Sequence, residues 1–450
     1  MTDQIQAVHT FPPGFLWGTA TAAHQVEGGN HNSWTEWEQT PGRVFQNQRS
    51  GAACGWWEGR AEEDFDRAAA LNNNALRLSV EWSRVEPEPG RWDEGALARY
   101  REMILALRAR GLEPMVTLHH FANPVWLEER GSWANAETPA LFARYAAKVV
   151  GALGDQVTLW CTINEPMVYA AYGFLLGYWP PGHTSLDETF AVIANLAQGH
   201  AEAYHAIKQA SPAAQVGFAK HQISFRADNP TGWVGARTLH WLFNEMIFGP
   251  FLSGKLRLPL RRAVRLPKAQ GALDWIGLQY YHRQTVRLNL KRPEMFFFEQ
   301  SVREEVPHGP QPQWGEFAPE ETFRRIDHLW KLTRLPIYVT EVGVPDPDDT
   351  IRPGYLARTV RSVWDARVGN LPVKGMFWWS LVDNFEWAEG YDPRFRFGLY
   401  GVDFATGERT LRRSGELYRA VCGANALSAD MVRRHAPEVL PTLFPEPRTP

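Results

Sequence analysis

The chain has 450 residues, with 47 Lys and Arg against 50 Asp and Glu, a formal net charge of −3 and 44% hydrophobic residues. This balance excludes the strongly basic surface that nucleic-acid-binding proteins carry, and no run of five like charges occurs in the chain. The length would suit about three domains of roughly 150 residues, but α/β barrels often exceed 200 residues as one domain.

Eight short runs rich in β-branched and aromatic residues recur along the chain, and longer segments with helical periodicity separate them. The predicted strands are Phe15–Thr19, Ala75–Trp82, Glu113–His120, Val157–Asn164, Val216–Gln222, Trp275–Tyr281, Ile337–Glu341 and Gly375–Leu381. Predicted amphipathic helices include residues 62–72, 96–111 and 138–154. Strands that alternate with helices form parallel βαβ units, and eight of them favour a single closed (β/α)8 TIM barrel with long βα loops. No glycine-rich nucleotide-binding motif follows a predicted strand, so an open nucleotide-binding sheet has little support.

Helix boundaries are predicted from capping residues. Gly111 and Gly154 stand where helix C-termini favour a left-handed residue, and Thr138 followed by Pro139 predicts an N-cap with proline at the first helical position. Residues 283–319 lack a clear pattern and are expected to form a long βα loop, and the tail after His435 is expected to be a surface extension. We predict one catalytic domain over residues 1–450, with its core at about 11–422 and a C-terminal extension at 423–450.

The three cysteines and the termini bear on the cellular compartment. Cys54, Cys161 and Cys422 are few and far apart, which predicts neither a disulfide framework nor a zinc site. The first residues lack the basic and apolar regions of a secretory signal, and no stretch of about 18 apolar residues occurs. We therefore expect a cytoplasmic protein without a membrane or nucleic-acid partner.

Polar residues gather where the predicted strands end, which is where barrel enzymes hold their chemistry. They are His119, His120, Thr162–Pro166, Gln279–Tyr281, Thr340, Glu341 and Ser380–Trp387. Glu165 and Glu341 each end an otherwise apolar run. Cleavage of a glycosidic bond needs a proton donor for the leaving oxygen and a carboxylate for the oxocarbenium-like centre, so this pair suggests an acid and a nucleophile. The sequence fixes no distance between the two groups.

Several segments resemble glycoside hydrolase family 1, in the order of that family. They are FLWGTATAAHQVEG at 15–28, TINEP at 162–166, YVTEVG at 338–343 and WWSLVDNFEWAEGY at 378–391. The resemblance runs from about Phe11 to Tyr418. It implies a retaining β-glycosidase on a (β/α)8 barrel, with Glu165 as the acid/base and Glu341 as the nucleophile. A retaining mechanism requires the two carboxyl groups to lie about 5–5.5 Å apart.

The same resemblance implies a set of sugar-binding and supporting residues. The sugar-binding set is Gln25, His120, Asn164, Tyr281, Trp379, Glu386 and Trp387, supported by Arg77 and Gln279. Carboxylate and amide groups in this set suit bidentate bonds to sugar hydroxyls, and tryptophan faces suit the C–H side of a sugar ring. Tyr281 and Arg77 are candidates to set the basicity of Glu341. Three positions depart from the family pattern, because Val342 and Gln279 each stand where the family usually has Asn, and Ala122 stands where many members have Asp.

Alternative interpretations exist for some of these residues. A lone histidine after an apolar strand, such as His120, is often a core residue, and only its companion motifs favour contact with sugar. Trp378 and Trp379 are adjacent in a strand and point to opposite faces, so one of them at most lines a pocket, and the family selects Trp379. Trp126 or Trp314 is expected near the leaving-group site.

The sequence as a whole predicts a β-glucosidase that removes terminal non-reducing β-D-glucosyl residues, with galactosyl and fucosyl residues as other options. Glu386 and Trp387 favour an unphosphorylated sugar, since a carboxylate would repel a phosphate. The partner is a small-molecule β-glycoside or oligosaccharide, no metal or organic cofactor is required, and the oligomeric state is not determined. A transglycosylating β-glycosidase and a non-catalytic sugar-binding barrel are the alternatives.

Overall fold

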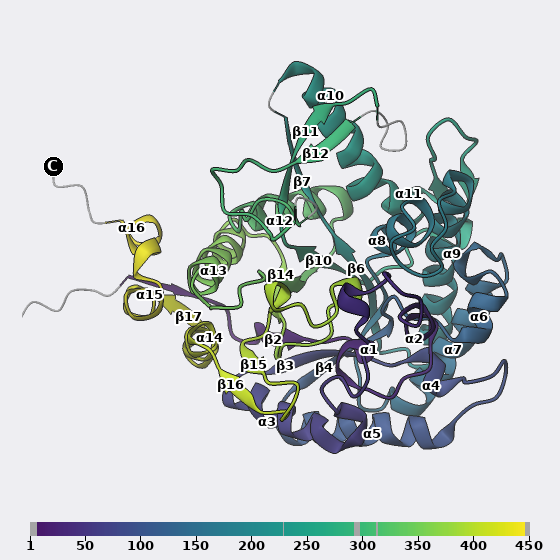
Figure 1. Ribbon diagram of the computed structural model, residues 1–450, viewed down its shortest axis with the longest axis horizontal. Coiled ribbons are helices and arrows are strands. Elements are labelled where there is room, and N and C mark those ends of the chain that lie inside the picture. The colour runs from purple at the N-terminus through teal and green to yellow at the C-terminus, as the bar shows by residue number, and fades with distance from the viewer. Residues whose placement is uncertain (1–6, 228, 292–297, 312–313, 446–450) are drawn as a thin grey trace, which may run out of the picture.

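Eight parallel strands form a closed barrel at the centre of the protein (Figure 1), which confirms the predicted fold class. The computed structural model describes residues 7–227, 229–291, 298–311 and 314–445. The barrel strands are β2 (Leu16–Ala20), β3 (Ala75–Ser79), β4 (Glu113–His119), β5 (Leu159–Asn164), β6 (Gln215–His221), β10 (Trp275–Tyr280), β13 (Ile337–Val342) and β14 (Val373–Trp379). They follow one another around the barrel in chain order, and β14 closes it against β2.

The eight predicted strands coincide with these eight elements and differ only at their ends. The largest difference is in β3, which ends at Ser79, whereas the prediction ran to Trp82. Trp82 begins the short helix α4 (Trp82–Val85) instead. Almost every position of the barrel strands is buried, because helices cover the outside and side chains fill the inside. This burial on both faces explains why the strands appear in the sequence as continuous apolar runs.

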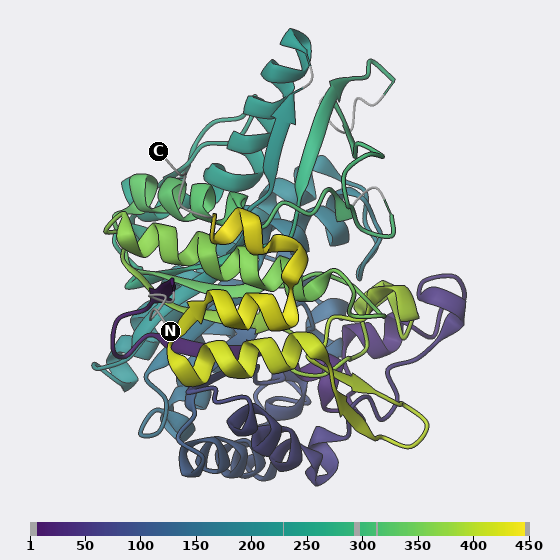
Figure 2. The same ribbon diagram turned by 90° about the vertical axis from the view of Figure 1, so that its left-hand side faces the viewer.

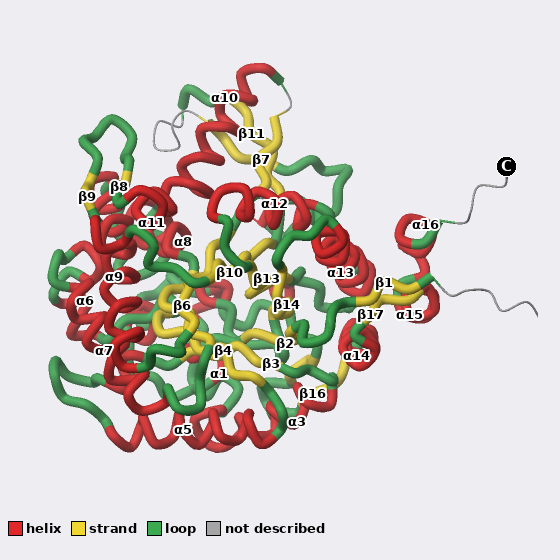
Figure 3. The backbone as a smooth tube through the Cα atoms, turned by 180° about the vertical axis from the view of Figure 1, so that it is seen from behind, coloured by secondary structure: helices red, strands yellow, loops and turns green. Residues whose placement is uncertain are grey.

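Helices form a layer around the barrel, which Figure 3 shows from behind. The long ones are α3 (Ala61–Ala70), α5 (Glu94–Ala109), α7 (Thr138–Leu153), α9 (Leu186–Ala210), α12 (Glu321–Thr333), α13 (Arg352–Val368) and α14 (Arg413–Ala424). The predicted helices at 62–72, 96–111 and 138–154 are confirmed as α3, α5 and α7. Each turns an apolar stripe towards the barrel, as in Phe142, Tyr145 and Val149 of α7, which are fully buried.

Two of the boundary predictions are wrong, and one is confirmed. Gly111 has a φ of +72° and takes the left-handed conformation after α5. Gly154 has a φ of −67° and is not left-handed. A Cβ atom there would lie 2.6 Å from the Val150 carbonyl oxygen, so the position favours glycine because of this close approach. Thr138 is already helical and does not cap α7, because its hydroxyl donates to the Ser132 carbonyl oxygen at 2.6 Å.

Shorter helices and strands lie in the segments that connect the main elements of the barrel. The short helices are α1 (Ala23–Val26), α2 (Ser33–Trp37), α6 (Val125–Glu129), α8 (Pro166–Ala170), α10 (Pro230–Leu239), α11 (Gly249–Ser253), α15 (Ala429–His435) and α16 (Leu440–Leu443), with the π-helical turns η4 (Ala171–Leu175) and η5 (His240–Glu245). Two small antiparallel sheets pair β8 (Lys255–Leu256) with β9 (Val264–Arg265) and β15 (Tyr400–Val402) with β16 (Arg409–Leu411).

The expectation of a plain loop at residues 283–319 is corrected by a three-stranded sheet. In it β11 (Arg283–Leu288) lies between β12 (Phe298–Ser301) and β7 (Ser224–Ala227). This sheet and α10 project from one side of the barrel (Figure 2). The pairing of β11 with β7 joins segments about sixty residues apart, so local pattern could not reveal it. Residues 292–297 and 312–313 of the predicted loop lie outside the described residues.

The two ends of the described chain meet on the outside of the barrel. Strand β1 (Val8–Thr10) pairs antiparallel with β17 (Ala426–Ser428), which lies in the predicted C-terminal extension. Beyond His435, the chain is partly packed and not only a surface extension, since Leu443 is buried and its carbonyl oxygen accepts a bond from Arg361 at 2.8 Å. Within the described ranges, the structure has no helix that is both long and apolar enough to cross a membrane.

Candidate active site

A cavity of about 810 Å³ lies at the C-terminal ends of the barrel strands. Eight of the eleven predicted site residues line it, namely His120, Asn164, Glu165, Tyr281, Glu341, Trp379, Glu386 and Trp387. They lie at the ends of β4, β5, β10, β13 and β14 or in the loops that follow, so the strand ends bring together residues that are up to 267 positions apart in the chain. Gln25, Arg77 and Gln279 do not line the cavity and contact the lining residues from behind.

Glu341 near the end of β13 is held by two hydrogen-bond donors. Arg77 donates to its Oε1 atom from a fully buried guanidinium, and the Tyr281 hydroxyl donates to its Oε2 atom at 2.6 Å. Burial raises the pKa of Glu341 to about 7, while the charge of Arg77 and the Tyr281 bond act in the opposite direction. These donors fix the carboxyl group in one orientation and favour its ionised form.

Glu165 stands directly after β5 and has a different environment. Its φ of +44° is a left-handed conformation, which a residue with a side chain rarely adopts and which is found often at functional sites. Among the described residues, only the His221 ring brings a polar atom close to its carboxyl group, with Nδ1 3.3 Å from Oε1. Burial raises the pKa of Glu165 to about 7, and the positive charges of Lys220 and Arg77 oppose that rise.

The two carboxyl groups influence each other. A negative charge on Glu165 is one of the causes that raise the pKa of Glu341, so double ionisation of the pair is unfavourable. A single proton is then expected to reside on the group with fewer donors. That group is Glu165, because Arg77 and Tyr281 donate their hydrogen bonds to Glu341 and not to Glu165. The arrangement provides one acid and one anionic carboxylate in the same cavity.

Asn164 is oriented by two neighbours, one of which, Arg77, also donates to Glu341. Its Oδ1 atom accepts bonds from Arg77 at 2.6 Å and from Gln279 at 2.8 Å. The amide nitrogen is therefore directed away from these donors, and it is buried without a partner among the described residues. Gln279 thus keeps an amide contact despite its departure from the family pattern. An N–H group that is buried and unpaired beside a carboxylate pair is suited to donate to a ligand hydroxyl.

The opposite wall combines polar and aromatic side chains. Gln25 donates through Nε2 to Glu386 at 3.1 Å, and its own Oε1 atom has no partner in the described part of the chain. The His120 ring lies 5.9 Å from that of Trp387 and nearly parallel to it, and its Nδ1 atom is unpaired as well. Indole faces beside polar atoms that lack partners are the features of a site that binds a sugar ring.

The structure also shows which of the adjacent tryptophans, and which of the two tryptophans expected near the leaving group, lines the cavity. Trp379 lines the cavity, whereas Trp378 is fully buried, and its ring lies 6.2 Å from that of Tyr355. Trp314 lines the cavity, but Trp126 does not, because its indole N–H donates to the Glu86 carbonyl oxygen at 2.9 Å. Val342 is buried and is not part of the lining, so the family asparagine is replaced here by a packing residue.

Sequence reasoning missed several residues of the cavity. They are His221, Tyr172, Trp179, Phe243 and Phe397, among others. His221 is the most consequential of them because it contacts Glu165. Its position near the end of a predicted strand was a signal that could have identified it, as for the other strand-end residues. Tyr172 and Trp179 belong to the irregular segment after α8, which carries no comparable signal.

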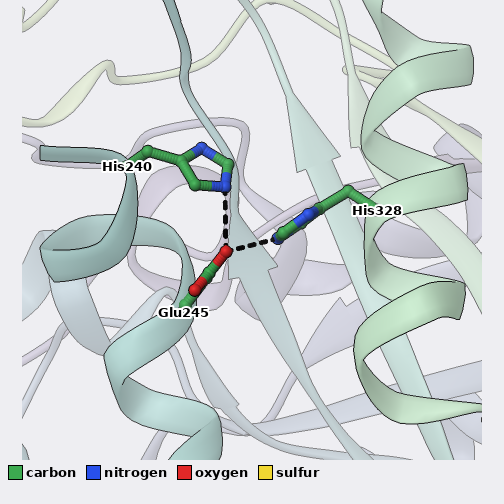
Figure 4. A group of neighbouring side chains, drawn as sticks. All are labelled: His240, Glu245 and His328. Atoms are coloured by element: carbon green, nitrogen blue, oxygen red, sulfur yellow. Dashed lines mark ion pairs between the residues drawn. The ribbon is translucent and has the colours of Figure 1, made fainter. Parts of the chain in front are cut away.

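One group of side chains outside the cavity has the composition of a metal site (Figure 4). His240 Nε2 and His328 Nε2 lie 3.2 Å and 3.6 Å from the same Glu245 oxygen. The hydrogen bonds argue against metal binding. The Asn244 amide nitrogen donates to His240 Nδ1 at 2.9 Å, and its orientation is fixed because its oxygen accepts from the Ile223 N–H. His240 therefore carries its proton on Nε2, the nitrogen that lies 3.2 Å from Glu245, which is the reverse of the polarity of a metal-bound histidine.

Comparisons with known proteins agree with this geometry. The family model described as glycosyl hydrolase family 1 matches residues 7–427. Beta-glucosidase A of Thermotoga maritima is 31% identical over 450 residues, which cover 93% of this chain and 99% of that protein. A beta-glycosidase from Pyrococcus horikoshii has a similar structure, with a TM-score of 0.88 and 35% identity over 95% of this chain and 98% of that one. The T. maritima beta-glucosidase in complex with deoxynojirimycin is similar at a TM-score of 0.86, with 30% identity over 93% of this chain and all of that chain.

Proposed function

This chain belongs to glycosyl hydrolase family 1, and on that premise we propose that it removes terminal non-reducing β-D-glucosyl residues, with Glu341 as the nucleophile and Glu165 as the acid/base. It is a glycoside hydrolase with the family's retaining mechanism. In the first step Glu341 bonds to the anomeric carbon while Glu165 gives its proton to the leaving oxygen. In the second step Glu165 takes a proton from water, whose oxygen attacks the anomeric carbon and breaks the ester to Glu341.

The observation that carries the assignment of roles is the unequal supply of donors to the two carboxyl groups. Arg77 and Tyr281 contact Glu341, which supports an ionised nucleophile in a fixed orientation. Glu165 is buried, and among the described residues no donor is hydrogen-bonded to its carboxyl group, with His221 Nδ1 3.3 Å away, which supports a protonated acid. A general acid at neutral pH needs such a raised pKa, and a nucleophile needs a group that is already ionised.

The proposal for the sugar rests on Gln25, Glu386 and the two tryptophans. Glu386 lines the cavity, where its carboxyl group suits sugar hydroxyls, and it accepts a bond at 3.1 Å from Gln25 behind it, whose Oε1 atom is an additional acceptor without a partner among the described residues. Glu386 is buried, and its carboxylate disfavours a phosphorylated sugar. A panel of p-nitrophenyl β-glycosides tests this choice, with the glucoside expected to give the highest kcat/KM and the 6-phosphoglucoside the lowest. If the galactoside or the fucoside gave a higher kcat/KM than the glucoside, the site would be the same but the preferred sugar would be galactose or fucose.

The roles of the two carboxylates are tested by paired glycine variants with azide as an external nucleophile. Glu341→Gly is expected to lose hydrolysis by about 10⁴-fold or more and, with azide and an activated aryl glucoside, to form the α-glucosyl azide. Glu165→Gly is expected to form the β-glucosyl azide, because azide attacks the glucosyl-enzyme in place of the activated water. The opposite pair of anomers would reverse the assignment. Unchanged hydrolysis in both variants, with tight binding of a glucose-like ligand, would favour a non-catalytic sugar-binding barrel.

A further inference from the structure

Strand β6 places a lysine beside the acid/base residue, because the Glu165 N–H donates at 2.9 Å to the carbonyl oxygen of Ala219, the residue before Lys220. Lys220 is fully buried, and its ammonium donates to the His221 carbonyl oxygen and lies 4.1 Å from the centre of the Phe243 ring. Within the described ranges, no carboxylate lies within 4 Å of its Nζ atom. A buried cation without such a partner is costly, and a fold that retains one usually has a use for it.

The one opposite charge that acts on Lys220 is that of Glu165. Burial lowers the pKa of Lys220 to about 7, and the Glu165 charge opposes this. In return, Lys220 is the first of the charges that lower the pKa of Glu165, ahead of Arg77. The two groups therefore titrate as a coupled pair, in which the charged form of each group favours the charged form of the other.

The groups that surround this pair come from every wall of the site. Glu165 experiences Arg77 and Lys220 as positive charges and contacts His221, while its own charge acts on Glu341, Tyr281, Glu386 and Tyr172. Lys220 acts on His221 of its own strand and on His240 of η5. Burial lowers the pKa of both histidines to about 3, so both are neutral when the enzyme acts. Lys220 and Arg77 are thus the positive charges available to a newly ionised Glu165, and Arg77 is already bonded to Glu341.

We propose that Lys220 is a positioning residue for the acid/base step, whose buried ammonium balances the charge that Glu165 acquires when it gives up its proton. This inference rests on the proposed role of Glu165. While Glu165 is ionised, its charge favours the protonated form of Lys220. In the first step the Glu165 proton passes to the leaving oxygen, and in the second step Glu165 takes a proton from the attacking water. In the interval the carboxylate has the ammonium as its counter-charge.

The test compares Lys220→Met with Lys220→Arg and with Lys208→Met as a matched control. Lys208 is also partly buried, but it pairs with Asp274 outside the cavity. Loss of a positive charge raises the pKa of Glu165. In Lys220→Met, the basic limb of kcat/KM with a phenyl glucoside, which reports loss of the Glu165 proton in the free enzyme, is therefore expected to move up by about one pH unit. The acid limb of kcat with a dinitrophenyl glucoside, where deglycosylation requires ionised Glu165, is expected to move up as well.

Lys220→Arg and Lys208→Met are expected to keep both limbs near those of the parent. A merely structural role for Lys220 would lower the rates without moving the limbs, and that result would overturn the proposal. Removal of a buried charge should not prevent folding, and Lys220→Gln is a second neutral variant with the same expected shift. Glu165→Gln separates the two proposals. If Glu165→Gln retains the basic limb of kcat/KM, the proposed role of Glu165 is wrong. If Glu165→Gln loses that limb but Lys220→Met does not shift it, only the proposed role of Lys220 is wrong.

Discussion

Two buried carboxylates near the same rim of the barrel have opposite environments. Asp383, in the loop after β14, is 1% exposed and accepts two bonds from Arg412 at 2.8 Å, a bond from the Gly398 N–H at 2.9 Å and an ion pair from Arg396 at 3.5 Å. Glu165, after β5, is 8% exposed, and in the described part of the chain its carboxyl group accepts no hydrogen bond and has one ion-pair contact, with His221 at 3.3 Å. Burial is similar in the two places, but the number of donors is not.

On the roles proposed above, the supply of donors, and not burial by itself, separates the structural carboxylate Asp383 from the reactive carboxylate Glu165. The donors of Asp383 replace the water that it lost, and its carboxyl group holds two arginines and the loop in place. Glu165 lost its water without replacement, so its neutral form is favoured and a proton is available. Glu341 lies between the two cases, with donors from Arg77 and Tyr281 that leave it ionised.

Loss of the donor-poor carboxyl group should have the larger effect on the reaction. Glu165→Ala is expected to lower kcat/KM by about 10²–10⁴-fold for glucosides with poor leaving groups, because a general acid contributes on that scale. For a dinitrophenyl glucoside the loss in kcat/KM should be much smaller, since that leaving group needs little protonation. Steady-state kinetics across a leaving-group series measures this. An equal loss for every leaving group would contradict the acid role.

Loss of charge at the donor-rich carboxylate should instead affect folding. Asp383→Asn leaves Arg412 and Arg396 without their anion and is expected to lower the free energy of unfolding by about 3–5 kcal/mol. Urea denaturation measures this change. The pH limbs of kcat/KM for the folded protein are expected to stay at their parental values, because Asp383 does not line the cavity. Shifted limbs at unchanged stability would mean that Asp383 belongs with the reactive group.

Removal of one hydrogen-bond donor from Glu341 should make its environment more like that of Glu165. Tyr281→Phe deletes the hydroxyl that donates at 2.6 Å, which corresponds to about 1.5–3 kcal/mol for a bond to a charged acceptor, or about 10–100-fold in kcat/KM. The lost bond favoured the ionised form, so the pKa of Glu341 rises and the acid limb of kcat/KM should move to higher pH. Tyr178→Phe, at an exposed position of the same cavity, is the control. An unmoved acid limb would show that Arg77 alone maintains the ionised state.

The sequence predicted the barrel well because its strands are buried on both faces and its helices are amphipathic. Local pattern is sufficient for both signals, and the runs at Glu113–His120 and Trp275–Tyr281 match β4 and β10 closely. The segment at 283–319 failed because β11 finds its parallel partner in β7, far away in the chain. Gly154 failed because glycine also serves close packing, which sequence alone does not distinguish from a left-handed turn.

The site residues in motifs at strand ends could be predicted from the sequence. Residues that act through their contact with another site residue could not. Eight predicted residues line the cavity, but Lys220 was missed because a lysine within a strand ordinarily points to solvent. Its burial depends on Phe243 of η5, which folds over β6 from a later segment. His221 was missed for a related reason, since its value lies in contact with Glu165 and not in its own chemistry.

A residue of the cavity wall that touches neither carboxyl group gives the baseline for this comparison. Trp314 lines the cavity outside the carboxylate pair, and its ring lies 5.0 Å from that of Phe395 and 5.7 Å from that of Phe397. An aromatic ring that packs against the leaving group contributes about 0.5–1.5 kcal/mol, so Trp314→Ala should raise KM for cellobiose and aryl glucosides by roughly 2- to 10-fold. Binding of deoxynojirimycin, which has no leaving group, should be unchanged, as should both pH limbs. Trp330→Ala, on α12 and outside the cavity, serves as the control. If Trp314→Ala weakened deoxynojirimycin binding as strongly as substrate binding, the ring would belong to the site of the cleaved sugar, and the leaving group would have to lie elsewhere in the cavity.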